Sequence, residues 1–188
     1  MSSVSIAGDT SGSILLAAPT VAGANTATLP ARTGNVAMDG PAFSAYLGTN
    51  QTAASAFQIV QPNVKEFDTA TCYNNTGSTV TLNGISVPAY SFAPNVAGYY
   101  WFNGAVDNAS GSPSRSIASI YKNGSEFKRG NDIDATGGDG GGPVVSALVY
   151  CNGTSDYIQF YVFYVGGGVF AGGYVSQSYF QGFLARAA

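Results

Sequence analysis

Histidine is absent from this 188-residue chain, and charged residues of any kind make up only 9 % of it. Without histidine, carboxylates are the remaining choice for general acid–base chemistry, and the ten Asp and Glu residues are scattered along the sequence. The seven Lys and Arg residues are also dispersed, and the net charge is −3, which argues against a phosphate-backbone footprint. We therefore expect no enzymatic activity, no cofactor and no nucleic-acid partner.

The low content of charged residues also constrains the composition of the protein surface. Typical globular proteins contain roughly 25 % charged residues. Much of the surface of this protein must therefore consist of polar neutral side chains and exposed aromatic edges. A lone soluble domain rarely exposes large contiguous apolar patches. We therefore expect part of the apolar surface to be buried between identical subunits.

Long apolar runs are missing as well, and the first residues show neither a basic nor an apolar signal-peptide region. The expectation is a protein made in the cytoplasm without membrane insertion. Cys72 and Cys151 lie far apart in the sequence with no CxxC pattern. Two ordinary thiols are favoured over a disulfide, although a disulfide stays possible.

Aromatic residues are absent from residues 1–42, and all 24 of them follow. The first part is too lean in large side chains to offset the entropy of its own ordering. Residues 43–188 contain enough apolar bulk for one domain core. We predict an N-terminal attachment segment, 1–42, and a globular head, 43–188.

Turn signals divide the head into short apolar runs. Asn-Gly pairs begin at Asn83, Asn103, Asn123 and Asn152, and the runs between them are rich in Val, Ile, Tyr and Phe. This punctuation is typical of antiparallel hairpins, and no window favours a long helix. The pattern predicts an all-β sandwich of about ten short strands, near residues 43–47, 57–60, 64–67, 80–82, 90–92, 99–106, 116–121, 144–150, 157–165, 169–175 and 179–185.

The run 156–165 is apolar or aromatic on both faces, whereas an antiparallel sheet normally leaves one face wet. Tyr157, Tyr161 and Phe163 share one of these faces. We favour contact of that face with a neighbouring subunit. The alternative is a central strand covered by a loop.

The N-terminal segment contains two short extended pieces, 13–16 and 26–29. A hairpin of this kind is marginal alone and becomes stable when it pairs with another chain. The candidate docking residues are its larger apolar side chains, Ile14, Leu15, Leu16, Val21 and Leu29. A disordered tail is the alternative.

The densest acidic set is Asp132, Asp134 and Asp139, which begins like a calcium-binding loop. Its twelfth position is Pro143, where such a loop requires a bidentate glutamate. A solvated glycine-rich loop is the favoured interpretation, and we predict no metal site.

Three segments, in order, resemble the globular head of complement component one, subcomponent q. The first is Phe67-Asp68-Thr69 followed by Tyr73-Asn74. The second is 92–102 (FAPNVAGYYWF), continuing into the hairpin 120–124 (IYKNG). The third is 179–184 (YFQGFL). The stretches 76–89 and 137–142 look like additions particular to this chain.

This resemblance implies a jelly roll shared with the tumour necrosis factor family and a compact homotrimer. It also implies that aromatic residues of the final strand lie near the threefold axis. On this chain those residues are Tyr179, Phe180 and Phe183.

The first part, from Gly8 to Gly34, resembles a segment found near the N-termini of tailed-bacteriophage fibre and virion proteins. Together the two resemblances imply a structural protein at the capsid or tail surface, either a fibre or a head-fibre or decoration protein. The N-terminal attachment segment would contact other virion proteins, and the globular head would contact a host-surface glycan or protein. A bacterial lectin-like adhesion module is the alternative, followed by a small surface hydrolase.

Overall fold

A computed structural model describes residues 3–7, 13–17, 40–111, 113–134 and 142–188. The chain divides into two compact units, Met1–Val36 and Ala37–Ala188. Within the described residues every regular element is a β-strand, every strand pair is antiparallel, and no helix could cross a membrane. The expected all-β class is confirmed.

The first unit contains one hairpin. β1 (Ser3–Ala7) pairs with β2 (Ser13–Ala17), and Ile6 lies opposite Ile14. The predicted extended piece at 13–16 is therefore confirmed, but its partner lies before it in the sequence. The other predicted piece, 26–29, falls outside the described residues.

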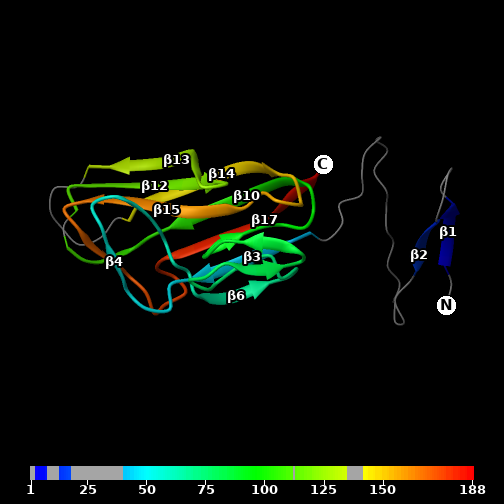
Figure 1. The fold of residues 1–188 in the computed structure, drawn as a ribbon, viewed down its shortest axis with the longest axis horizontal. Coiled ribbons are helices and arrows are strands. Elements are labelled where there is room, and N and C mark those ends of the chain that lie inside the picture. The colour runs from blue at the N-terminus through cyan, green and yellow to red at the C-terminus, as the bar shows by residue number, and fades with distance from the viewer. Residues whose placement is uncertain (1–2, 8–12, 18–39, 112, 135–141) are drawn as a thin grey trace, which may run out of the picture. The chain divides into compact units, whose positions relative to one another are not determined.

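The second unit contains two five-stranded sheets, which Figure 1 shows as a sandwich. The strands of the first sheet are, in spatial order, β14 (Val144–Cys151), β10 (Gly98–Ala105), β17 (Tyr179–Ala187), β3 (Ala42–Tyr46) and β6 (Val64–Asp68). On β14, exposed and buried residues alternate strictly. One face of this sheet therefore packs on the core, and the other faces outward.

The second sheet has the path β13 (Ser125–Ile133), β12 (Arg115–Lys122), β15 (Ile158–Val165) and β5 (Phe57–Ile59), and β9 (Ser91–Phe92) also pairs with β15. Two smaller sheets complete the unit. One contains β11 (Asn108–Ser110), β16 (Gly168–Phe170) and β4 (Gln51–Ala53), and the other is the hairpin of β7 (Val80–Leu82) and β8 (Ile85–Val87). Fifteen strands are thus described in this unit, more than the eleven positions predicted.

Aromatic rings fill the space between the two large sheets. Phe43 stacks on Tyr73 and on Phe92, with ring centroids 4.6 Å apart in each pair, and meets Phe180 edge-on at 5.0 Å. The buried Tyr73 hydroxyl donates to the Pro62 carbonyl at 3.0 Å, so its polar end is satisfied. This core is what fixes the relative position of the outward-facing residues.

Two of the predicted Asn-Gly turns have the backbone that such turns require. Asn83 and Asn123 have φ of 50° and 52°, and the glycines that follow have φ of 77° and 79°. The prediction at Asn103 is wrong, because Asn103 and Gly104 lie inside β10. A Cβ on Gly104 would come within 2.8 Å of the Phe160 ring, so this glycine serves close packing.

Candidate functional site

The outward side of the first sheet carries a set of large apolar side chains. Trp101 on β10 pairs with Leu148 on β14 and with Phe183 on β17. These three side chains are 42 %, 50 % and 51 % exposed. The neighbouring cross-strand pair, Tyr99 and Tyr150, has ring centroids 5.5 Å apart. We call this set, with Phe67 on β6, the aromatic face: Phe67, Tyr99, Trp101, Leu148, Tyr150 and Phe183.

The aromatic face is hollowed between β6, β10 and β17. The hollow has a volume of about 360 Å³, and Phe67, Trp101 and Phe183 are among its lining residues. Asn103 and Gln181 also line it. A depression surrounded by three half-exposed rings can accept an apolar side chain from another molecule.

The residues predicted for the trimer axis separate onto two sides of β17. Phe183 belongs to the aromatic face, and the half-buried Tyr179 has the same strand parity. Phe180 is fully buried, and its ring packs against Phe43, Phe102 and Phe160 inside the core. Phe180 therefore faces away from the aromatic face, because successive residues of a strand point to opposite faces. The placement of Tyr179, Phe180 and Phe183 near a threefold axis stays a prediction.

The residues predicted for a subunit interface lie immediately before β15 and on it, and they have two different environments. Tyr157 packs against the small cluster of Ile85, Val87 and Ala93, so the added hairpin β7–β8 covers it. Contact of this face with a neighbouring subunit stays a prediction.

Tyr161 and Phe163 are half-buried further along β15. Tyr161 stacks on Tyr121 at 4.0 Å between ring centroids, and Phe163 lies 5.1 Å from Phe57. The Arg129 guanidinium lies 5.5 Å from the Phe57 ring centroid. Burial raises the pKa of Tyr161, with a smaller contribution from Tyr157. These rings contact one another and a cation within one chain, so they have intramolecular partners that the sequence did not indicate.

Among the described residues, no group of three or more cysteine or acidic side chains is placed to hold a metal ion. Asp132 accepts two hydrogen bonds from Arg115, at 2.9 Å from Nε and 2.5 Å from Nη2. These bonds lower the pKa of Asp132. Asp134 is exposed, and Asp139 falls outside the described residues.

Cys72 and Cys151 are both buried free thiols. Burial is the main cause that raises the pKa of both, and that of Cys151 reaches about 12. At neutral pH neither group is a thiolate, which is the form that reacts and binds metals.

The predicted docking residues of the first unit are only partly described. Ile14, Leu15 and Leu16 lie on β2, while Val21 and Leu29 fall outside the described residues.

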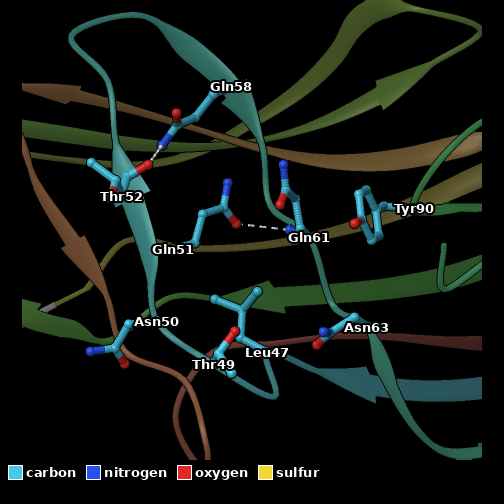
Figure 2. Close-up of a pocket in the computed structure, with 9 residues that line it drawn as sticks. All are labelled: Leu47, Thr49, Asn50, Gln51, Thr52, Gln58, Gln61, Asn63 and Tyr90. Carbon is cyan, nitrogen blue, oxygen red and sulfur yellow. Dashed lines mark hydrogen bonds between the residues drawn. The ribbon is translucent and has the colours of Figure 1, made fainter. Parts of the chain in front are cut away.

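A second hollow, which the sequence did not indicate, lies beside the segment that connects β4 to β5 and has a volume of about 380 Å³. Figure 2 shows Gln51 and Thr52 on one side of it and Gln61 and Tyr90 on the other. We call it the amide pocket, after the five carboxamide side chains among its lining residues, which are Leu47, Thr49, Asn50, Gln51, Thr52, Gln58, Gln61, Asn63 and Tyr90. The signal that could have found it is the concentration of Asn and Gln between residues 50 and 63.

No family model matches this sequence, and no curated protein matches it either. Solved structures do match. The vertex protein P5 of phage PRD1 is similar over 80 % of this chain and 100 % of its own, with a TM-score of 0.51 and 15 % identity. Murine APRIL is similar over 77 % of this chain and 98 % of its own, with a TM-score of 0.50 and 8 % identity. At these identities the likeness concerns the fold, and it is consistent with a jelly roll of the tumour necrosis factor type.

Proposed function

We propose that this protein is a non-enzymatic structural component of a tailed-phage virion, either a fibre or a head-fibre or decoration protein. Its jelly-roll head forms a homotrimer and projects from the capsid or tail surface toward the host. The observation that carries the proposal is the aromatic face, whose six members are large, exposed apolar side chains gathered on one side of one sheet.

A second and third copy of this chain are the occupants that suit the aromatic face best. None of its six members is charged, so burying them against identical residues leaves no unpaired charge. Cyclic oligomers use the same surface patches on every copy, and the hollow beside Phe183 offers a place for a neighbour's side chain. Such aromatic residues are enriched at the centres of stable interfaces.

The virion assignment rests on two supports. The fold is similar to that of a protein whose name identifies it as a PRD1 vertex protein. The N-terminal unit, Met1–Val36, contains the β1–β2 hairpin, whose strand edges can pair with another protein. We infer that this unit attaches the head to other virion proteins.

Host contact follows from the projecting position. Three identical heads on one spike raise the avidity for a repetitive cell-surface glycan or protein, because later contacts become intramolecular. The protein would be made in the host cytoplasm before assembly, without membrane insertion.

The trimer is tested with Phe183→Glu in the full chain. Light scattering coupled to size exclusion at micromolar concentration should give three times the chain mass for the wild type and one chain mass for the variant, because the interface would bury a charge. Phe127→Glu is the matched control, since Phe127 is 43 % exposed on β13 of the other sheet, and it should stay trimeric. A monomeric wild type would contradict the proposal.

The virion role is tested by particle incorporation. A variant lacking residues 1–36 should remain trimeric and be absent from purified particles, whereas the full chain should be incorporated. A cryo-electron microscopy map of the particle would then place the protein on the capsid or on the tail. A full chain that trimerises and never co-purifies with particles would contradict the virion assignment.

A bacterial lectin-like adhesion module is the second candidate. The amide pocket favours it, because a polar, uncharged hollow can serve recognition without any virion. A trimeric protein that binds cell-surface glycans but is never incorporated into particles would support this alternative.

A further inference from the structure

The amide pocket is lined by groups of one chemical character. Five carboxamides, two threonine hydroxyls, one tyrosine ring and one leucine surround it, and no lining residue is charged. Carboxamides present donors and acceptors side by side, which is what the hydroxyl groups of a sugar require. We propose that this pocket binds a neutral saccharide.

Two glutamines hold the wall of the pocket formed by β4, β5 and their connection in place. Gln51 donates from Nε2 to the Ile59 carbonyl at 2.8 Å, and its Oε1 accepts from the Gln61 amide at 3.0 Å. Gln58 bridges in the same manner, donating to the Thr52 carbonyl at 3.3 Å and accepting from the Ala54 amide at 3.1 Å. Figure 2 draws the bonds from Gln51 to Gln61 and from Gln58 to Thr52. The wall therefore has a fixed shape before a ligand arrives.

Other amides of the pocket retain hydrogen-bonding capacity. Asn50 and Asn63 each use Oδ1, accepting from the backbone amides of Gly172 at 2.9 Å and Gly48 at 2.8 Å. Within the described part of the chain their Nδ2 groups have no acceptor, and the Gln61 side chain has no partner at either end. The Asn50 and Asn63 amides, each fixed through its Oδ1, and the free Gln61 amide are donors and acceptors that a ligand can use.

Tyr90 supplies the aromatic surface. Its backbone has φ of 50°, a left-handed conformation that costs a bulky residue free energy. Its amide donates to the Thr76 carbonyl at 3.2 Å, which helps to retain this conformation. Strained backbone of this kind concentrates at binding sites. The ring offers an apolar surface to the C–H face of a sugar.

Charge and size narrow the ligand class. A uronic or sialic acid would bring a carboxylate into a pocket whose lining offers no cation, at the cost of desolvating that charge. The volume of about 380 Å³ is at the lower end of the ~300–1,000 Å³ typical of small-molecule sites. A neutral sugar of one or two rings suits it. This inference rests on the proposed host-binding role and names its ligand class.

The test uses the full-length protein and saturation-transfer NMR, followed by calorimetry. The probes are the neutral disaccharides maltose, lactose, chitobiose and mannobiose, and a glucuronic-acid disaccharide serves for comparison. At least one neutral probe should bind, and the acidic probe should not. Gln61→Ala should weaken binding about three- to tenfold, the equivalent of one hydrogen bond.

The second variant is Tyr90→Asn, because asparagine tolerates the left-handed backbone and removes the ring. It should also weaken binding about three- to tenfold. The matched controls are Ser125→Ala and Phe127→Ala on β13, at the opposite edge of its sheet from β5, and they should bind as the wild type does.

Failure of the inference is distinguishable from failure of the proposed function. Binding of the acidic probe alone, of no probe, or of a neutral probe equally by both pocket variants would overturn the saccharide site. Incorporation into particles and host adsorption would be unaffected by that result. Conversely, a neutral sugar bound in the pocket by a protein that never enters particles would support the site and reject the virion role.

Discussion

Asp156 is a buried carboxylate, and both of its oxygens are engaged by neighbours at the end of β12 and in the turns beside it. Asn123 donates to it at 2.7 Å, the Asn152 amide at 2.9 Å and the Lys122 ammonium at 2.9 Å. Burial by itself would raise the pKa of Asp156, but these hydrogen bonds outweigh burial, and the pKa is lowered. The ionised side chain therefore ties the turn after β12 to the turn before β15.

Asp156→Asn should lower the free energy of unfolding at pH 7 by about 1–3 kcal/mol, the usual cost of leaving buried hydrogen-bonding groups unpaired. Because the folded pKa lies below the unfolded one, the contribution is complete above about pH 5 and is lost as the pH falls through the folded pKa. Urea unfolding at pH 7 and pH 3, at one fixed protein concentration, measures it. An equal difference between wild type and variant at both pH values would contradict this account.

Residue types alone predict part of the candidate site. Strand alternation, which the sequence shows, already separates Phe180 from Tyr179 and Phe183. The family resemblance identified their strand but did not say which face each residue takes. Tyr90 could not have been placed in the amide pocket from the sequence, because only the fold brings it next to Gln61.

At the scale of elements, β13 is the longest strand that sequence patterning missed. Ser125–Ile133 is almost entirely exposed and carries Glu126, Lys128, Arg129 and Asp132, so it has no apolar alternation to detect. Its place at the edge of the second sheet explains this composition. Charges on an edge strand oppose pairing with other chains. The strand is therefore defined by its partner β12 and not by burial.

The strands that the sequence predicted correctly are rich in buried apolar residues, unlike β13. β10 and β15 combine buried apolar residues with long runs of β-branched and aromatic residues, and their predicted positions agree with the structure within one or two residues. The missed strands β4, β8 and β11 contain three residues each, too few for a periodic pattern.

The hairpin turn between β12 and β13 supplies an element-scale prediction. Gly124 has φ of 79°, so Gly124→Ala should cost about 1–2 kcal/mol of unfolding free energy, the penalty of a left-handed backbone for an L-residue. Its added Cβ would also lie 3.2 Å from the Tyr157 hydroxyl.

Gly84→Ala is the control, because Gly84 has nearly the same φ and nothing within 4 Å of the added Cβ. Thermal or urea unfolding of both variants measures the backbone penalty and the added contact separately. Gly124→Ala should be the more destabilising of the two. If Gly124→Ala were as stable as the wild type, the turn between β12 and β13 would have to adopt another conformation.

At the scale of the whole molecule, assembly should be visible in the fluorescence of Trp101. It is the single tryptophan of the chain and a member of the aromatic face, 42 % exposed in one subunit. Burial of the aromatic face in the proposed trimer should shift its emission to shorter wavelength. Phe183→Glu should shift the emission back toward that of an indole in water.

Dilution provides the control for this prediction. Assembly by mass action makes the wild-type emission depend on protein concentration near the dissociation range, while the emission of Phe183→Glu should stay constant. Identical spectra for the two proteins at micromolar concentration would mean that Trp101 is not buried by self-association.

The seclusion of Cys72 and Cys151 has a consequence for the lifetime of the assembled protein. Oxygen and peroxide oxidise cysteine through its deprotonated and solvent-accessible form. Cys72 and Cys151 are buried and have raised pKa values, so they meet neither condition. Neighbouring copies held at high density therefore have no cysteine with which to crosslink while they stay folded. If the proposed virion role holds, these two thiols should stay reduced and unlinked after release from the cell into aerated surroundings.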